Sequence, residues 1–282
     1  MEHIGEILKK QARINTSSKN MDTLSNAEKS EVASPASACP ICKGAGFVHP
    51  RLPSGKPDYS RTVPCSCTLP ERKKEHQSRL RKYSGLEAKL LKNMTFDNFD
   101  WKRVNLPPEQ RENLKKAFDT ALDFAKSPEG WLVFQGVNGC GKTHLAAAIA
   151  NYLLKEGKPV KFVVVPDLLD HLRSTFSPES PVTYDQLFEE VKNAPLLIMD
   201  DLGKQSTTPW AEEKLYQIIN HRYNHQLPTV VTTNCTTDEI DPPISSRFAD
   251  PKISVLFYIM APDYWSGRPA QKRTTRTKKR TS

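Results

Sequence analysis

The sequence GVNGCGKT, residues Gly136 to Thr143, decides the fold of this 282-residue chain. It follows the apolar run 131–135, which is typical of a buried strand, and it opens the run 143–154, whose apolar residues recur at helical spacing. A strand, a glycine-rich loop and a helix in this order form the phosphate-binding P-loop. The glycines let backbone N–H groups turn toward phosphate oxygens, and the N-terminus of the helix adds positive partial charge. The chain is therefore predicted to bind the phosphates of a nucleotide.

Two side chains of the loop have specific expected roles. Lys142 is expected to reach the β and γ phosphates of ATP, and the hydroxyl of Thr143 is expected to bind Mg²⁺. Cys140 is expected to be a small buried thiol within the loop. The candidate nucleotide-binding residues also include the rest of the loop and the start of the helix, namely Gly136, Asn138, Gly139, Cys140, Gly141 and His144.

Strands and helices alternate along the chain from residue 95 onward. The further runs that are apolar and rich in β-branched residues, as expected for buried strands, are 160–165, 196–199, 229–233 and 253–259. The runs with helical spacing between them are 167–176, 184–191 and 210–225. Because parallel strands are joined by helical crossovers, this order predicts an α/β fold, a P-loop NTPase domain with a parallel sheet covered by helices on both faces.

Polar side chains follow two of the predicted strands. Asp200 and Asp201 follow 196–199, and Asn234 follows 229–233. Because the carboxyl ends of parallel strands meet at the edge that carries the P-loop, these side chains are expected near the phosphates. Asp200 is expected to help hold Mg²⁺, and Asp201 to act as the general base that orients the attacking water. Asn234 is expected to hydrogen-bond that water or the γ phosphate, and the alternative is a turn residue that closes the strand.

Arg247 lies in the segment 244–248 and is the candidate arginine finger. Such an arginine acts on the γ phosphate of a nucleotide bound to a neighbouring copy and stabilises the charge that develops during transfer. This role implies a homo-oligomer formed through Arg247. The alternative is an ordinary surface arginine in contact with solvent.

With these motifs, residues 95–263 resemble the AAA+ ATPases of the bacterial helicase-loader type, DnaC and DnaI, and the related transposition helper IstB. The Walker A segment is 136–143, the Walker B segment is 196–203, sensor I is 232–234 and the arginine-finger segment is 246–248. Two further segments, 167–173 and 261–263, also carry the resemblance. It implies ATP hydrolysis and makes Arg268 the candidate sensor II residue. Asp201 stands where the family usually has Glu, which implies slow hydrolysis suited to a switch.

Four cysteines ahead of this domain lie in two close pairs, Cys39 with Cys42 and Cys65 with Cys67. The spacing is close to that of a small zinc ribbon, in which four thiolates hold Zn²⁺ in a closed tetrahedral site. An iron–sulfur cluster uses the same ligands and is the alternative. A cysteine module in this place is similar to the N-terminal arrangement of DnaI-like loaders, and this resemblance implies docking to a replicative helicase.

Positive charge is concentrated on the flanks of the predicted ATPase domain. The net charge of the chain is +9; residues 71–94 carry eight basic and three acidic side chains, and residues 269–282 carry six basic and no acidic ones. These flanks are expected to contact polyanions. The predicted parts are a flexible segment 1–38, the cysteine module 39–70, a basic helical linker 71–94, the AAA+ domain 95–268 and a disordered basic tail 269–282.

No apolar run approaches the roughly 20 residues that a membrane-spanning helix needs, and the first residues lack a secretory signal. A cytoplasmic protein without a membrane partner is therefore expected. The combined prediction is an ATP-dependent replicative helicase loader that binds ATP and single-stranded DNA, with Arg173 and Phe176 as candidate DNA contacts. The alternatives are an IstB-like transposition helper ATPase that binds duplex DNA and a non-catalytic, nucleotide-switched DNA-binding adaptor.

Overall fold

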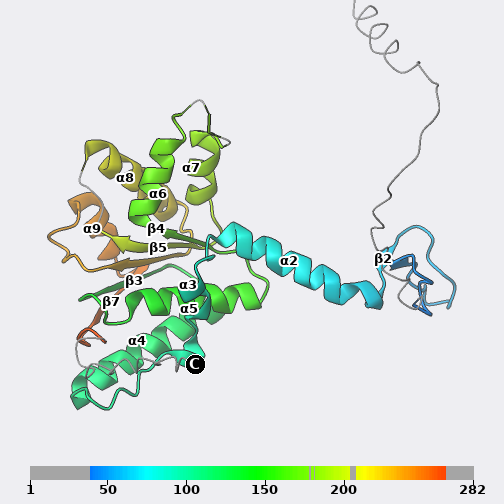
Figure 1. Cartoon of the computed structure of the whole chain (residues 1–282), viewed down its shortest axis with the longest axis horizontal. Coiled ribbons are helices and arrows are strands. Elements are labelled where there is room, and N and C mark those ends of the chain that lie inside the picture. Colours follow the sequence, from blue (N-terminus) through cyan, green and yellow to red (C-terminus); the bar gives the residue numbers. More distant parts are fainter. Residues whose placement is uncertain (1–38, 178, 181, 204–207, 265–282) are drawn as a thin grey trace, which may run out of the picture. The chain divides into compact units, whose positions relative to one another are not determined.

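The computed structural model describes residues 39–177, 179–180, 182–203 and 208–264 (Figure 1). The chain divides into two compact units, Met1–Cys67 and Thr68–Ser282, and each is described by itself. The predicted flexible segment 1–38 and the predicted basic tail 269–282 lie outside the described residues. Among the helices that are described, none is both long and apolar enough to span a bilayer.

The larger unit, Thr68–Ser282, is built on a five-stranded parallel sheet. Every neighbouring pair of strands in it is parallel. The order β4-β5-β6-β3-β7 places β3, which leads into the P-loop, inside the sheet, and the predicted α/β fold is confirmed. The strands are β3 (Trp131–Gly136), β4 (Lys161–Val164), β5 (Leu197–Leu202), β6 (Thr229–Thr233) and β7 (Ser254–Ile259).

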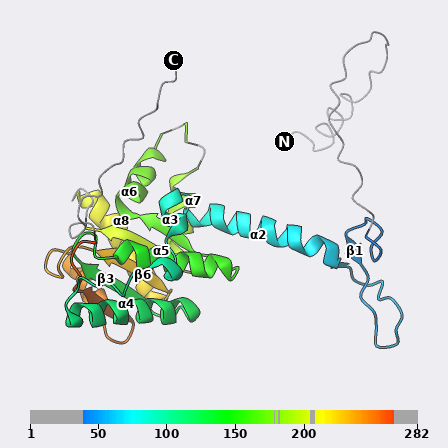
Figure 2. The same cartoon turned by 60° about the horizontal axis from the view of Figure 1, so that its bottom comes forward.

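Helices cover both faces of this sheet (Figures 1 and 2). The even-numbered side chains of β3 pack into one core with α4 (Pro108–Lys126) and α5 (Lys142–Lys155). Its odd-numbered side chains pack into a second core on the other face. A strand that is buried on both sides needs an apolar run without alternation, which is what residues 131–134 provide. The helices of the second core are α6 (Val165–Ser174), α7 (Tyr184–Lys192), α8 (Pro209–Asn224) and α9 (Pro242–Phe248).

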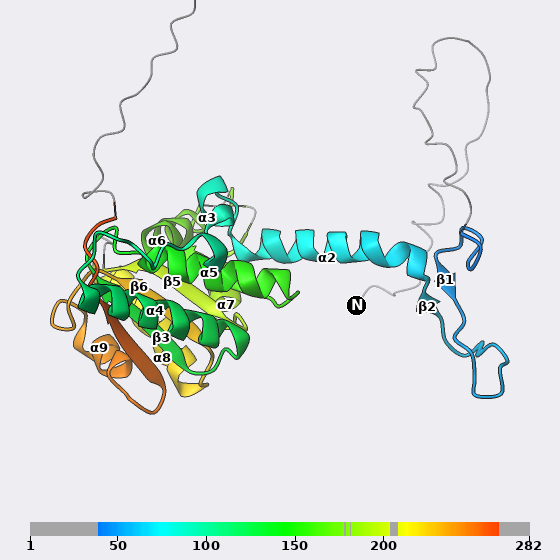
Figure 3. The same cartoon turned by 90° about the horizontal axis from the view of Figure 1, so that it is seen from below.

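The smaller unit, in its described residues 39–67, contains a two-stranded antiparallel sheet (Figure 3). Strand β1 (Phe47–Val48) pairs with β2 (Val63–Pro64), and the short 3-10 helix η1 (Ser66–Thr68) follows. The backbone N–H of Cys65 donates to the carbonyl oxygen of Gly46 at 2.9 Å. This hairpin therefore brings the end of β2 back to the turn that precedes β1.

The basic stretch 71–94 does not form the single helix that the sequence predicts. Helix α2 (Leu69–Ser84) ends at Gly85, which has a φ of 73°, and α3 (Lys89–Asn93) follows after a loop. A side chain at Gly85 would collide with the carbonyl oxygen of Phe162, 2.8 Å from an ideal Cβ. The sequence predicts one apolar stripe along the predicted single helix at Leu80, Tyr83, Leu86 and Leu90. Leu80 packs against the core and Leu86 is buried in it from the loop between the helices, whereas Leu90 is 68% exposed.

Other helix boundaries also differ from the sequence prediction. The helix predicted from Asp167 begins at Val165, because Pro166 occupies its first turn, where a missing N–H is tolerated. It ends at Ser174, so Phe176 lies beyond it. Helices α4 and α9 and the 3-10 helix η2 (Phe96–Asn98) were not predicted.

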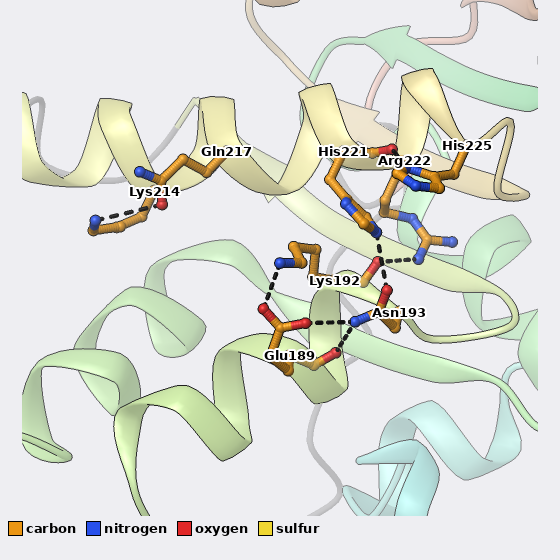
Figure 4. A network of polar contacts seen from close by, with 8 residues as sticks. All are labelled: Glu189, Lys192, Asn193, Lys214, Gln217, His221, Arg222 and His225. Carbon is orange, nitrogen blue, oxygen red and sulfur yellow. Dashed lines mark hydrogen bonds and ion pairs between the residues drawn. The ribbon is translucent and has the colours of Figure 1, made fainter.

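A buried arginine joins three elements of the larger unit (Figure 4). Arg222 of α8 is fully buried, and its guanidinium donates to the carbonyl oxygens of Lys192, Ala194 and Pro228 at 3.0, 2.8 and 2.6 Å. Its Nε donates to Thr229 Oγ1 at 2.9 Å. Burial lowers the pKa of Arg222 to about 10. The side chain therefore ties the end of α7 and the start of β6 to α8.

Candidate functional site

The P-loop joins the end of β3 to the start of α5. Gly139 and Gly141 have φ values of 72° and 116°, which L-residues with side chains rarely adopt. Lys142 is 5% exposed, and its ammonium donates to the carbonyl oxygens of Gly136 at 2.8 Å and Val137 at 2.9 Å. The loop thus wraps around its own lysine, which places the cation where phosphates would bind.

Strands β5 and β6 bring a carboxylate to the hydroxyl at the start of α5. Thr143 Oγ1 lies 2.9 Å from Asp200 Oδ1, and Thr232 Oγ1 donates to the same oxygen at 2.6 Å. Asp200 is 3% exposed, so its carboxylate has little contact with water. The hydrogen bonds from these two hydroxyls take the place of that water. A hydroxyl and a carboxylate in contact fit the oxygen ligands that Mg²⁺ prefers. Sequence reasoning missed Thr232, whose signal is its place at the end of a strand.

Asp201 lies at a break in the pairing of β5. The strand predicted as 196–199 continues to Leu202, with a register shift between Met199 and Leu202. Asp201 has a φ of 58°, and its backbone N–H donates to Thr232 Oγ1 at 3.0 Å. A non-glycine residue in this conformation costs roughly 1–3 kcal/mol, and such strain gathers at functional sites. The predicted strand end is therefore wrong, and a bulge positions Asp201 instead.

A cavity of about 560 Å³ opens beside the P-loop. This volume lies in the range of small-molecule and cofactor sites. Its polar wall consists of P-loop residues from Asn138 to His144 and of Asp201. A cavity of this size with the P-loop on one side can hold a nucleotide with its phosphates at the P-loop. The opposite wall mixes apolar and polar side chains and comes from α3, η2, α4, the loops on either side of η2 and the segment after β7, through Leu90, Asn93, Met94, Asn98, Phe99, Asp100, Arg103, Leu114 and Tyr264.

His144 holds this opposite wall against α5. Its Nε2 lies 3.0 Å from the carbonyl oxygen of Thr95 and 3.0 Å from Asn98 Oδ1. Its ring meets the ring of Phe99 edge to face, with the centroids 5.1 Å apart. Burial lowers the pKa of His144, which keeps the ring neutral at neutral pH. His144 therefore orients the wall of the cavity. Its hydrogen-bond partners in this wall lie 46 and 49 residues away along the chain, a distance that no local sequence pattern indicates.

The segment after β7 packs against the P-loop. The backbone N–H of Tyr264 donates to the carbonyl oxygen of Gly139 at 3.0 Å. The guanidinium of Arg103 lies 4.7 Å from the ring centroid of Tyr264 and donates to the carbonyl oxygen of Pro262 at 3.2 Å. Two segments from opposite ends of the larger unit therefore close the cavity together.

We expect Gly139→Ala to weaken ATP binding by about tenfold or more. An ideal Cβ at this position lies 1.9 Å from Asp263 Oδ1, so the methyl group must displace the Asp263 side chain, which packs against the P-loop. Strain of roughly 1–3 kcal/mol corresponds to such a loss. The control is Gly55→Ala, which has a similar φ of 82° and nothing within 4 Å of its Cβ. Equal affinities of the two variants in calorimetry would contradict the expected effect.

The other predicted catalytic residues do not line this cavity. Asn234 is exposed in the turn after β6. Arg247 lies on α9, and its guanidinium packs against Tyr216 and Tyr223 of α8, at 5.2 and 5.4 Å from the ring centroids. Arg268 lies outside the described residues.

The four cysteines of the smaller unit meet in one cluster. Their sulfur atoms all lie within 4.8 Å of one another. The Sγ atoms of Cys39 and Cys65 are 3.8 Å apart, and those of Cys42 and Cys67 are 3.5 Å apart. Thiolates that bind one tetrahedral Zn²⁺ at ~2.3 Å lie about 3.8 Å from each other. The cluster therefore fits a single metal ion, and it is too wide for disulfides, which need ~2.05 Å.

The charge of this cluster depends on its neighbours. A hydrogen bond from the backbone of Gly46 lowers the pKa of Cys42 to about 6. Hydrogen bonding with Cys42 raises the pKa of Cys67 to about 12. One thiolate thus forms readily, and further negative charge at the cluster needs a cation. His49 contacts the carbonyl oxygen of Arg61 at 3.0 Å and is not part of the cluster.

An aromatic patch lies where α6 ends and where α7 and α8 begin. We define it as Arg173, Phe176, Tyr184 and Trp210. Phe176 is 62% exposed and stacks on Tyr184, with the ring centroids 5.3 Å apart. The guanidinium of Arg173 lies 5.1 Å from the ring centroid of Trp210. Tyr184 and Trp210 are half-buried, so Phe176 is the exposed ring of this patch. An exposed aromatic ring near a cation is suited to stack a base.

Comparison with known proteins identifies relatives of the larger unit. The chain is 30% identical over 164 residues to the replicative helicase loader DnaC of Escherichia coli (strain K12), covering 57% of this chain and 63% of that protein. It is 33% identical over 129 residues to the replicative helicase loader DnaI of Bacillus subtilis (strain 168), covering 44% and 40%. The chain therefore spans less than two thirds of these curated relatives.

A solved structure and a protein family agree with this similarity. A crystal structure of the DnaC helicase loader superposes with a TM-score of 0.50 at 27% identity, covering 61% of this chain and 99% of that one. Residues 67–255, more than half of the chain, match the IstB-like ATP binding proteins. With its P-loop, parallel sheet and Thr143–Asp200 contact, the chain belongs to this family of AAA+ proteins.

Proposed function

We propose that this chain is an ATP-dependent replicative helicase loader of the cytoplasm. Lys142 and Thr143 line a nucleotide-sized cavity, and Asp200 contacts the Thr143 hydroxyl; this arrangement carries the ATP-binding part of the proposal. The similarity to DnaC and DnaI over the larger unit supports the loader part. The division into a cysteine module and an AAA+ domain belongs to the same proposal.

The residues around the cavity divide the work of ATP hydrolysis. Lys142 exchanges its two carbonyl partners for β and γ phosphate oxygens, while Thr143 and Asp200 hold the Mg²⁺. Bound Mg²⁺ offsets the negative charge of the phosphates. Asp201, which lines the cavity, accepts a proton from the attacking water. Because aspartate is one methylene shorter than glutamate, hydrolysis is slow.

Arg247 completes the site of a neighbouring copy in a homo-oligomer. We expect Arg247→Ala to leave ATP affinity unchanged and to lower turnover by about 100-fold or more, because a finger stabilises charge that develops only during transfer. Mixing this variant with Lys142→Ala protein should restore part of the activity, since each supplies the group that the other lacks. Steady-state ATPase assays of both variants and their mixture measure this.

The contrary outcome for Arg247 is also specific. Its contacts with Tyr216 and Tyr223 allow a structural role in packing α9 against α8. Such a role predicts lost ATP binding in Arg247→Ala and no recovery in the mixture. Arg247→Lys, which keeps the charge without the planar donor array, serves as the control.

The cysteine cluster is proposed to hold Zn²⁺ and to form the module that docks a replicative helicase. The spacing of the four sulfur atoms supports one tetrahedral ion. Zinc supplies structural cross-linking there, since four protein ligands leave no open position for chemistry. An iron–sulfur cluster is the alternative occupant of the same thiolates.

The aromatic patch is proposed to bind single-stranded DNA. Phe176 offers an exposed ring, and Arg173, which lies over the Trp210 ring and also pairs with Asp170 at 3.1 Å, offers a cation nearby. The alternative favoured by the family match is an IstB-like helper that binds duplex DNA and a transposase. A nucleotide-switched adaptor without turnover is the third possibility.

One experiment separates these functions. The purified chain is mixed with the replicative helicase of its own source, or with a transposase, and complexes are resolved by gel filtration with and without ATP. Transfer of the helicase onto circular single-stranded DNA, together with ATP turnover, supports the loader. Co-migration with the transposase alone overturns it in favour of the IstB-like function, and absence of turnover favours the adaptor.

A further inference from the structure

A second cavity, of about 550 Å³, lies between α2, α3 and α5 and shares no residue with the nucleotide cavity. Helix α2 contacts α5 within the larger unit, and Figure 3 shows it meeting the rest of that unit beside α3 and α5. We call this cavity the basic groove, because four of its lining residues are cations and no described carboxylate lines it. Its lining residues are Lys74, Gln77, Ser78, Arg81, Lys92, Thr95, Asn151, Leu154 and Lys155.

The four cations of the groove are not neutralised by the protein. Within the part of the chain that the structure describes, Lys74, Arg81, Lys92 and Lys155 form no ion pair. By contrast, the lysines of α4 pair with carboxylates one helical turn away. Like charges that share a groove repel one another. Their gathering therefore points to an anion from outside the chain.

Helix ends account for part of this charge. Arg81, Lys92 and Lys155 lie in the last turns of α2, α3 and α5, where cations complement the helix dipole. Each helix end supplies roughly half a negative charge, so three ends offset at most about 1.5 of the four positive charges. Lys74 is the sixth residue of α2 and lies outside the last turn, so the helix dipole does not offset its charge. The groove stays positive after this correction.

We propose that the basic groove binds the phosphodiester backbone of single-stranded nucleic acid, at a site separate from the aromatic patch. Lys74 and Arg81 are seven positions apart on α2, which places them about 10 Å apart along the helix axis. That distance suits successive phosphates of a strand better than one phosphate. Gln77 and Ser78, on the turn between them, add uncharged donors for the backbone. The cavity has the volume of a small ligand, which accommodates one strand and not a duplex.

This inference rests on the DNA-binding part of the proposed function and adds a second contact to it. The test uses the full chain and a fluorescein-labelled oligothymidylate, with anisotropy titrations at several salt concentrations. The groove variant replaces Lys74, Arg81, Lys92 and Lys155 by glutamine. The control variant replaces four exposed cations of α2 and α3 that do not line the groove, Lys73, Arg79, Lys82 and Lys89.

We expect the groove variant to bind the oligothymidylate more weakly and with a smaller slope of log K against log salt. We expect the control variant to keep the affinity and the slope of the wild-type chain. Each lost phosphate contact removes roughly 0.7 from the slope of log K against log salt for single strands, so four contacts remove about 2–3. Both variants remove four positive charges, so the long-range electrostatic attraction of the chain for DNA falls equally in both. The double variant Lys74→Gln/Lys155→Gln changes only exposed side chains and should lose about half as much slope. Equal slopes in the groove and control variants overturn the proposal.

The remaining outcomes separate this proposal from the function it rests on. If the wild-type chain binds the oligothymidylate and Arg173→Gln weakens binding while the groove variant does not, the groove proposal falls and the DNA-binding function stands. If the wild-type chain does not bind at any salt concentration, the DNA-binding part of the proposed function fails. A duplex that competes more strongly than the single strand overturns the assignment of the strand type.

Discussion

Changing Cys42 to serine is expected to unfold the smaller unit and to release its metal, while the larger unit stays folded. Metal binding in small zinc modules supplies roughly 10–16 kcal/mol at neutral pH, and this free energy is folding free energy. The described part of the unit has little else to stabilise it, since its strands are two residues long and Ile41, Phe47 and Tyr59 are exposed. Serine keeps the size of the side chain and removes the thiolate.

Metal analysis and proteolysis of the intact chain measure this effect. The wild-type chain should carry about one zinc per molecule, and Cys42→Ser should carry none and be cut rapidly between residues 39 and 67. The control is Cys235→Ser, which lies outside the cluster and should keep the metal. A brown protein with iron and sulfide supports the alternative cluster. A metal-free chain that resists proteolysis contradicts the structural role of the cysteines.

Local patterns were sufficient where the site is built from contiguous residues. The P-loop needs a strand, a turn with positive φ and a helix, and all three are encoded between residues 131 and 154. The place of Asp200 follows from the parallel sheet, because the strand order brings β5 near β3 with β6 between them. The four-cysteine cluster follows in the same way from two short spacings and one hairpin.

The remainder of the site depends on contacts between distant segments. Phe99 and Tyr264 reach the cavity from before β3 and after β7, and no periodicity relates them to the P-loop. The bulge at Asp201 arises from pairing with β6, which a strand pattern does not encode. At Gly85, a local signal for a helix end was present, but the close approach of the Phe162 carbonyl is what requires glycine there.

We expect Arg222→Met to lower the unfolding free energy of the larger unit by roughly 3–5 kcal/mol. Methionine fills much of the same volume, so the loss comes from the donors that it lacks. Without them, the buried carbonyl oxygen of Ala194, the part-buried ones of Lys192 and Pro228 and the Thr229 hydroxyl lose the partner that the guanidinium provides. A buried acceptor left without its partner costs about 1–3 kcal/mol, and removing a buried charge without a carboxylate partner returns part of that sum.

Urea unfolding followed by tryptophan fluorescence measures the effect of Arg222→Met, because all four tryptophans of the chain follow residue 67 and report on the larger unit. The matched control is His225→Ala at the C-cap of the same helix, an exposed member of the network in Figure 4, which should change stability by less than about 0.5 kcal/mol. Arg222→Lys separates the effect of the positive charge from that of the planar guanidinium. An ammonium keeps the charge but lacks the planar array of N–H donors that reaches α7 and β6 at the same time. It should therefore recover only part of the loss. If Arg222→Met is as stable as the wild-type chain, the desolvation of the guanidinium outweighs its hydrogen bonds, and the joint between α7, α8 and β6 is held by apolar packing instead.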